Sequence, residues 1–216
     1  THIHTLTQHD ALPILYSLHD EVLQGMHPAL DLADPLPGLK IGFEVEPLGM
    51  LFALLASFLW VVTSVYSIGY MRSHHEWRQT SYYSYFAVAL GSVMGIAFAA
   101  NLLTLFIFYE LLTLSTYPLV THAGDNAARH AGRMYLGYLL GTSVLMLSLA
   151  LIWTWSLTGS LDFRAGGILQ GTVTPGIAGV LLVLFLFGIG KAAIIPFHIC
   201  LTASMVAPTP VSALLQ

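Results

Sequence analysis

Two ionisable side chains lie in long apolar stretches of the sequence, where charged groups are rare. Glu110 is the only Asp, Glu, Lys or Arg in residues 79–124, and Lys191 is the only one in residues 165–216. A charged side chain near the middle of a bilayer costs roughly 2.5–3.5 kcal/mol on insertion scales, and such residues commonly mark ion or proton pathways. An acid and a base in these positions therefore point to proton translocation.

Each of these two residues also has a plain structural alternative. Burial penalises the charged form of either group and a nearby opposite charge restores it, so a Glu–Lys pair of variable separation can take up and release a proton. Glu110 could instead be an inert, hydrogen-bonded residue, and Lys191 could extend from a helix end to the membrane surface. At least 25 uncharged residues on each side of Lys191 argue against the second alternative.

His198 and Arg133 are further candidates for the same chemistry. An unperturbed histidine side chain titrates near neutral pH, so His198 could relay a proton, although a packing role is an equal alternative. Arg133 could be a charge partner of Glu110, but an anchor at the membrane surface is the better interpretation of its position next to a polar loop.

The residues around Lys191 predict a break in its helix. Gly188 and Gly190 permit close backbone approach and loosen the helix before Lys191. Pro196 has no backbone N–H and its ring clashes with the preceding turn, so we expect the helix to break there. Non-helical backbone at membrane depth is tolerated only where it is buried or lines a wet cavity. The predicted break therefore points to a functional site.

The elements that position these residues are expected to be membrane helices. The 216 residues are 56% hydrophobic and 8% charged, with a mean hydropathy of +0.75, whereas about 25% of residues are charged in a soluble domain. This composition excludes a water-soluble globule, and the absence of basic patches disfavours a nucleic-acid partner.

Metal and cofactor sites are not expected in this chain. The single cysteine, Cys200, excludes an internal disulfide framework and a cysteine-rich metal or iron–sulfur site. The histidines at positions 2, 4 and 9 fit no structural metal-binding motif. We therefore expect no metal ion and no redox cofactor bound to the chain itself.

The distribution of charge divides the chain near residue 47. Residues 1–47 hold seven of the eleven acidic residues and five of the ten histidines, which makes a polar extramembrane segment. Residues 48–216 are expected to form a partial transmembrane domain. Because the chain begins with Thr and shows no signal peptide, we expect a fragment of a longer protein or a trimmed chain.

Hydrophobic runs predict an all-α transmembrane bundle of about five spans. The apolar run 81–122 would be about 60 Å long as one helix, so we expect two helices with a turn at Asn101. Glu110 then lies about 13 Å past that turn, near the middle of the bilayer. The predicted helices are 48–71, 82–99, 102–121, 133–157, and one that runs from Pro175 through Lys191 towards Pro196.

Basic residues predict the orientation in the membrane, and aromatic residues its surface. The loops after the first and third predicted helices carry Arg72, Arg78, Arg129 and Arg133, and the other side carries Lys40 and Arg164. The positive-inside rule therefore places the first group in the cytoplasm and the acidic amino-terminal segment outside, in a bacterial inner membrane. Trp77 and the tyrosines at 82, 83 and 85 are expected to form an interfacial belt.

Three segments resemble the antiporter-like membrane subunits. FIFYELLTLSTYPLV, which contains Glu110, is similar to their glutamate-bearing fifth helix, and FEVEPLGMLFALLASFLWVVTSVYSIGYM is similar to their third helix. GIGKAAIIPFHICLTASMVAPTPVSALL, which contains Lys191, is similar to their broken seventh helix and the start of the eighth, and its APTPVSALL run is highly specific. The family comprises the proton-pumping subunits of respiratory complex I, the A-type and D-type proteins of Mrp cation/proton antiporters, and related hydrogenase subunits. The resemblance covers about residues 43–216, and YELLTLSTYPLV leans towards the D-type Mrp proteins.

The resemblance implies a fold and roles for the candidate residues. It implies that the chain supplies helices three to seven, the first of two inverted five-helix repeats. It also implies that Glu110 and Lys191 are the family's paired acid and base, and that His198 matches the histidine after the break in many members. Cys200 and Thr202 depart from the Trp and Pro that members usually carry there.

Three functional hypotheses follow from the residues and the resemblance. The leading one is a proton-translocating subunit, or a fragment of one, in a multisubunit antiporter that exchanges protons for Na⁺ or K⁺. The alternative is a proton-pumping subunit in the membrane arm of an NADH:quinone oxidoreductase or hydrogenase, with the redox chemistry in other chains. The third is a scaffold that transports nothing. All three predict contact with lipid and with other membrane subunits.

Overall fold

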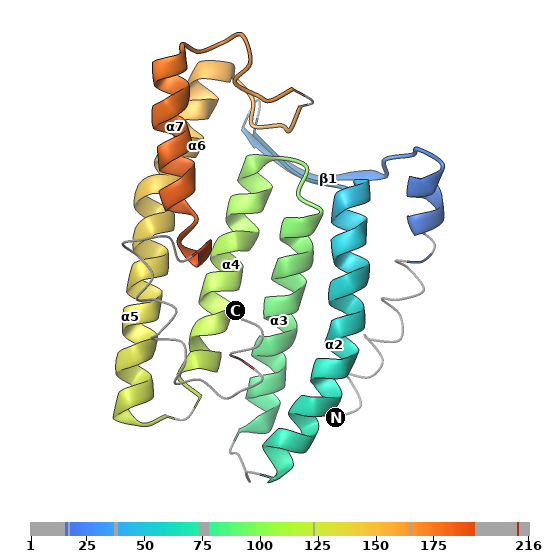
Figure 1. Cartoon of the computed structure of the whole chain (residues 1–216), viewed down its shortest axis with the longest axis vertical. Coiled ribbons are helices and arrows are strands. Elements are labelled where there is room, and N and C mark those ends of the chain that lie inside the picture. The colour runs from blue at the N-terminus through green and yellow to red at the C-terminus, as the bar shows by residue number, and fades with distance from the viewer. Residues whose placement is uncertain are drawn as a thin grey trace.

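The computed structural model describes residues 16, 18–36, 39–73, 78–122, 124–164, 166–192 and 211. Over these residues the chain is a bundle of long helices with a two-stranded hairpin lying across one end (Figure 1). In chain order, the elements are β1 (Ala29–Leu36), β2 (Leu39–Glu44), α2 (Pro47–Ser73), α3 (Gln79–Ala97), α4 (Leu102–Val120), α5 (Asn126–Thr142), the π-helical turn η1 (Ser143–Leu147), α6 (Ser148–Thr158), α7 (Pro175–Gly188) and the 3₁₀ turn η2 (Gly190–Ala192).

The helix lengths fit a polytopic membrane protein. Three helical segments among the described residues are long and apolar enough to cross a bilayer: α2, α4, and the continuous stretch from α5 through α6. The 19-residue α3 lies against α4, and the 14-residue α7 lies against η1 and α6 (Figure 1). The all-α transmembrane bundle expected from the sequence is therefore confirmed, with α3 and α7 beside the three long spans.

Asn101 separates α3 from α4, as the length of the apolar run predicted. Its extended backbone precedes α4, its Oδ1 accepts the N–H of Thr104 at 2.8 Å, and its Nδ2 donates to the carbonyl of Lys40 at 2.9 Å. An asparagine at this position satisfies one of the N–H groups that the first turn of a helix leaves without a partner. The same side chain therefore begins α4 and attaches it to the hairpin.

The hairpin is an element that the expectation of an all-α chain missed. β1 and β2 pair antiparallel, and β2 also bonds to the turn between α3 and α4. The N–H of Gly42 donates to Thr104 Oγ1 at 3.1 Å, and the N–H of Glu44 donates to the carbonyl of Phe98 at 2.8 Å. The segment predicted as a polar region apart from the membrane domain therefore covers the end of the α3–α4 pair.

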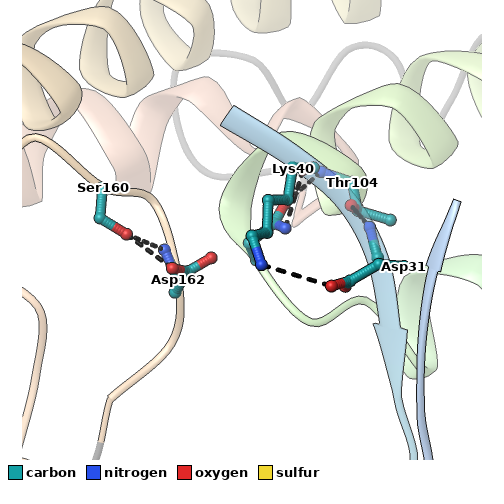
Figure 2. A network of polar contacts seen from close by, with 7 residues as sticks. Asp31, Lys40, Thr104, Ser160 and Asp162 are labelled. Atoms are coloured by element: carbon teal, nitrogen blue, oxygen red, sulfur yellow. Dashed lines mark hydrogen bonds and ion pairs between the residues drawn. The ribbon is translucent and has the colours of Figure 1, made fainter. Parts of the chain in front are cut away.

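Polar contacts occur within the hairpin and within the loop after α6 at this end (Figure 2). Lys40 Nζ lies 3.3 Å from Asp31 Oδ2, and the hydrogen bond and charge of Asp31 raise the pKa of Lys40 above its ordinary 10.5. In the loop after α6, Ser160 Oγ donates to Asp162 Oδ2 at 2.8 Å, and the carbonyl of Leu161 accepts the N–H of Leu102 at 3.0 Å. An exposed ion pair contributes little to stability, so the backbone hydrogen bonds to the turn carry most of this attachment.

The helix predicted over 133–157 begins seven residues earlier than expected. Asp125 accepts the N–H of Ala128 at 2.6 Å and so caps α5, which starts at Asn126. The polar residues predicted as a loop therefore form the first two turns of a helix. That helix changes at η1, where the N–H of Ser148 bonds to the carbonyl of Ser143, five residues earlier. Such π turns insert a residue and shift the helix register.

Helix α7 ends at Gly188, and the prediction that it runs through Lys191 towards Pro196 is wrong. Ile189 has a non-helical backbone (φ −83°, ψ 70°), and Lys191 lies in the 3₁₀ turn η2. Two glycines place this segment directly against the neighbouring helix: a Cβ on Gly188 would lie 2.7 Å from the backbone N of Leu147, and one on Gly190 would overlap Thr142 Oγ1. Pro196 lies outside the described residues.

Tyr82 belongs to the core and not to the predicted interfacial belt. Its side chain is 1% exposed, and its ring lies 5.9 Å from that of Phe86 and 5.3 Å from that of His122. Tyr85, by contrast, is 42% exposed, as a belt residue should be. Trp77 lies outside the described residues. The tyrosines thus divide between two faces of α3, a difference that only the packing of α3 on α4 decides.

We predict that Asn101→Ala lowers the stability of the protein by about 1–2 kcal/mol, because it removes the helix cap and the bond to Lys40. Thermal unfolding in detergent would measure this. Asn101→Ser is the matched control, since a serine hydroxyl can still accept the Thr104 N–H and the variant gives up the bond to the Lys40 carbonyl without adding a charge. Equal destabilisation by the two variants would show that the cap contributes nothing.

A second prediction concerns the approach of α7 to η1. Gly188→Ala should cost about 1–3 kcal/mol, since its Cβ would meet the Leu147 backbone and no flexible side chain can move aside. Gly179→Ala in the same helix meets no atom within 4 Å and should be neutral or slightly stabilising. Unfolding temperatures of the two variants would test this, and similar values would contradict the close approach.

Candidate functional site

Lys191 lies against helix α4, just after α7 has ended. Its Nζ donates to Thr113 Oγ1 at 3.0 Å, and its backbone N–H donates to Tyr109 Oη at 3.1 Å. The Nζ also lies 5.1 Å from the centroid of the Tyr109 ring, within the range of a cation–π contact. Tyr109 and Thr113 are four residues apart and so lie on one face of α4. They surround the ammonium group with a hydroxyl and an aromatic face.

Both of these α4 side chains are buried, whereas Lys191 itself is half-buried. Thr113 is 0% exposed and Tyr109 is 6% exposed. The Thr113 hydroxyl donates its own hydrogen to the Tyr109 carbonyl at 3.0 Å, so the Thr113 oxygen is left to act as the acceptor for the Lys191 ammonium. Thr113 thus accepts from the ammonium while its hydrogen is already committed to its own helix.

Glu110 lies in the same turn of α4 as these contacts. Both of its carboxylate oxygens are buried, and neither has a hydrogen-bond partner among the described residues. A buried carboxylate without a partner carries a large desolvation cost. Lys191 contacts the residue before Glu110 and the residue three positions after it, and Glu110 itself joins no ion pair within the described part of the chain. Lys191 therefore lies against α4 within one turn of Glu110, with its ammonium on Thr113.

The other hydroxyl groups of this region bond mainly to their own helices. Thr116 Oγ1 shares a hydrogen bond with Tyr135 Oη at 3.2 Å and so links α4 to α5. Thr142 donates to the carbonyls of Tyr138 and Leu139, in the turn just before η1. These hydroxyls keep polar atoms satisfied inside the bundle, which lipid cannot do.

The remaining predicted site residues divide into those near Lys191 and those away from it. Gly188 and Gly190 lie where α7 meets η1 and α5, directly before Lys191. Arg133 is exposed, its Nε donates to the Arg129 carbonyl at 3.4 Å, and it forms no ion pair with Glu110. This geometry fits the anchor interpretation better than the charge-partner one. His198, like Pro196, lies outside the described residues.

Tyr109 and Thr113 were not predicted from the sequence. Their spacing was visible in the sequence, because two polar residues four positions apart, one on each side of Glu110, lie on one face of a helix. That spacing alone does not show which residue they contact, since nothing local indicates that a residue 78 positions later contacts Thr113. Among the described residues, no three His, Cys, Asp or Glu side chains lie together as a metal site would need.

Comparison with solved structures supports the fold. A chain in the structure of the Mrp complex from Dietzia sp. DQ12-45-1b matches with a TM-score of 0.76 and 24% sequence identity, over 93% of this chain and 22% of that one. At this level of identity the match supports the fold alone. The expected antiporter-like architecture is therefore confirmed.

Curated proteins with similar sequences are quinone oxidoreductase subunits. NAD(P)H-quinone oxidoreductase chain 5 of Synechocystis sp. is 30% identical over 82% of this chain and 27% of the relative. The chloroplastic subunit 5 of Zygnema circumcarinatum is 33% identical over 82% of this chain and 26% of the relative. The chain thus spans about a quarter of the length of the curated relatives it matches.

Two family models match the chain in consecutive regions. The model described as NADH-Ubiquinone oxidoreductase (complex I), chain 5 N-terminus, matches residues 38–83, which include the end of the hairpin and α2. The model described as NADH:quinone oxidoreductase/Mrp antiporter, TM, matches residues 99–216, which include Glu110 and Lys191. Since the second match covers more than half of the sequence, this chain belongs to the transmembrane family shared by NADH:quinone oxidoreductases and Mrp antiporters.

Proposed function

We propose that the chain translocates protons within a multisubunit membrane assembly, with Glu110 and Lys191 as the exchanging acid and base. The observation that carries this proposal is the placement of Lys191 against α4 within one turn of Glu110, just after helix α7 has ended. A broken helix beside an ionisable residue is a common feature of ion sites in transporters. Membership of a family named for oxidoreductases and antiporters adds to this support.

The exchange uses the energetic difference between paired and separate charges. When Lys191 approaches Glu110, the ion pair favours the ionised carboxylate, and the acid releases its proton. When Lys191 moves away, the carboxylate is left buried and without a hydrogen-bond partner among the described residues, so protonation removes the desolvation cost. Alternation between these two arrangements would load and release one proton at Glu110. His198 remains a candidate for relaying that proton.

Two assemblies are candidates for the parent complex. The monovalent cation/proton antiporter is the first, supported by the fold it shares with a chain of the Mrp complex. An NADH:quinone oxidoreductase is the second, supported by the names of the curated relatives. Purification of the intact assembly distinguishes them, because only an oxidoreductase brings flavin or iron–sulfur subunits with this chain.

The ends of the bundle support an orientation within the membrane. The α2–α3 and α4–α5 connections lie at one end, and the hairpin and the α6–α7 loop lie at the other (Figure 1). The first end carries Arg72, Arg78, Arg129 and Arg133, whereas the second carries Lys40 and Arg164. By the positive-inside rule, the first end faces the cytoplasm and the hairpin faces outward, in a bacterial inner membrane.

The proposal predicts that Glu110→Gln and Lys191→Ala each stop proton translocation. Purified complex carrying either variant would be reconstituted into vesicles, and the pH change in the lumen would be followed with a fluorescent dye. We expect the rate to fall to that of protein-free vesicles, because either variant leaves one charge with no exchange partner.

Arg133→Gln provides the matched control for this experiment. It removes an exposed charge that forms no ion pair with Glu110, so the transport rate should stay at the wild-type level. Comparable amounts of each assembled complex on a native gel would show that the variants fold. Undiminished transport by both Glu110→Gln and Lys191→Ala would leave the chain as a non-transporting scaffold.

A further inference from the structure

We propose that Thr113 and Tyr109 form a second position for the Lys191 ammonium, which competes with Glu110 and holds the acid and base apart. This inference rests on the proposed proton exchange and names the residues that set the separated arrangement. The term "Thr113–Tyr109 cradle" denotes the Thr113 hydroxyl together with the ring and hydroxyl of Tyr109. Both are positioning residues, since neither gives up or takes the translocated proton.

The chemistry of the cradle suits a cation that has left its counter-ion. The Thr113 oxygen accepts from Lys191 Nζ at 3.0 Å, and its own hydrogen is bound to the Tyr109 carbonyl. This second bond polarises the hydroxyl and strengthens it as an acceptor. The Tyr109 ring, 5.1 Å from Nζ, presents its electron-rich face to the same charge. The ammonium is therefore partly solvated by protein groups that carry no charge.

Glu110 and Thr113 are neighbours on α4, and both can therefore compete for the Lys191 ammonium. Residues three apart on a helix have Cβ atoms about 5–6 Å from each other, so Thr113 and Glu110 are neighbours on α4. Lys191 carries its charge on a four-carbon side chain with several rotatable bonds. Rotation of that side chain could carry the ammonium from Thr113 to the carboxylate without movement of a helix.

The balance between the two positions depends on the state of the acid. A protonated Glu110 offers the ammonium no charge, and the cradle then binds it better. An ionised Glu110 offers the ammonium an opposite charge as well as a hydrogen-bond acceptor, whereas the cradle offers only uncharged groups, and so it draws the ammonium away. The structure has Lys191 on the cradle and a Glu110 carboxyl without a partner among the described residues, which is the separated arrangement of the two groups.

Tyr109 also fixes the chain that carries Lys191. Its hydroxyl accepts the backbone N–H of Lys191 at 3.1 Å, just after the end of α7. Replacement of Tyr109 would therefore disturb both the backbone and the ammonium. Thr113 accepts a hydrogen bond from the side chain of Lys191 and not from its backbone, so substitution of Thr113 alters the ammonium contact and not the backbone contact.

The test measures the protonated Glu110 carboxyl directly in the assembled complex. Its infrared C=O stretching band is assigned by its disappearance in Glu110→Gln. At a fixed neutral pH, Thr113→Val removes the acceptor while keeping the volume, so the ammonium should move to Glu110 and the band should weaken. Thr113→Ser restores the hydroxyl and should restore the band.

Transport provides the second readout. The proton translocation rate should fall roughly tenfold or more in Thr113→Val, in line with the loss of a hydrogen bond to a charged group, and recover in Thr113→Ser. Ser115→Ala is the matched control: it removes a buried α4 hydroxyl that bonds to the Leu112 carbonyl of its own helix. Both the band and the rate should be unchanged in this control.

The outcomes separate this inference from the proposed function. An unchanged carboxyl band in Thr113→Val, or an equal loss in Ser115→Ala, would overturn the cradle while leaving transport by the Glu110–Lys191 pair standing. Absence of any assignable Glu110 band in the wild-type complex would overturn it as well. Normal transport in Glu110→Gln would instead reject the proposed function, whatever the infrared bands show.

Discussion

The close contact between the end of α7 and the η1 turn determines where the Lys191 charge lies. Two glycines bring the α7 backbone against Leu147 and Thr142 at distances that a side chain would not allow. The chain then leaves the helix and turns towards α4, where Tyr109 accepts the Lys191 N–H. Without that approach, continued helix would carry Lys191 along the α7 axis and not onto α4. The position of the ammonium is thus a consequence of backbone packing.

The same contact brings together two segments in which the regular α-helical backbone is interrupted or ends. A π turn in one helix lies against the end of another, and both occur within the part of the bundle that lipid would surround. Irregular backbone is tolerated at membrane depth only where protein or water satisfies its polar groups. Thr142, the last residue of α5, and Ser143, the first residue of η1, donate their hydroxyl hydrogens to the carbonyls of Tyr138 and Leu139 here. The buried polar groups therefore lie in the same part of the bundle as the end of α7.

A related requirement governs the end of the bundle that carries the hairpin. The turn between α3 and α4 exposes backbone groups that two tightly packed helices cannot satisfy. Asn101 and strand β2 bond to those groups, and a loop after α6 joins them through Leu161. These bonds attach the start of α4 to the hairpin and to the loop after α6. The contacts of the hairpin with the start of α4 set the height of Glu110 in the bundle. The contacts of Gly188 and Gly190 at the end of α7 set the position of Lys191.

The sequence by itself determined the class of the protein, the turn at Asn101 and the position of two ionisable residues, Glu110 and Lys191, in apolar runs. These follow from local properties: the length of an apolar run, a capping side chain, and the cost of charge in hydrocarbon. The APTPVSALL run and the glutamate-bearing helix also identified the family. Only the tertiary structure decided that α7 ends before Lys191, that a hairpin covers the α3–α4 turn, and that Tyr109 and Thr113 receive the ammonium. These features depend on contacts between residues tens of positions apart, such as Gly190 with Thr142 and Lys191 with Thr113, and no periodicity or propensity along the chain encodes such contacts.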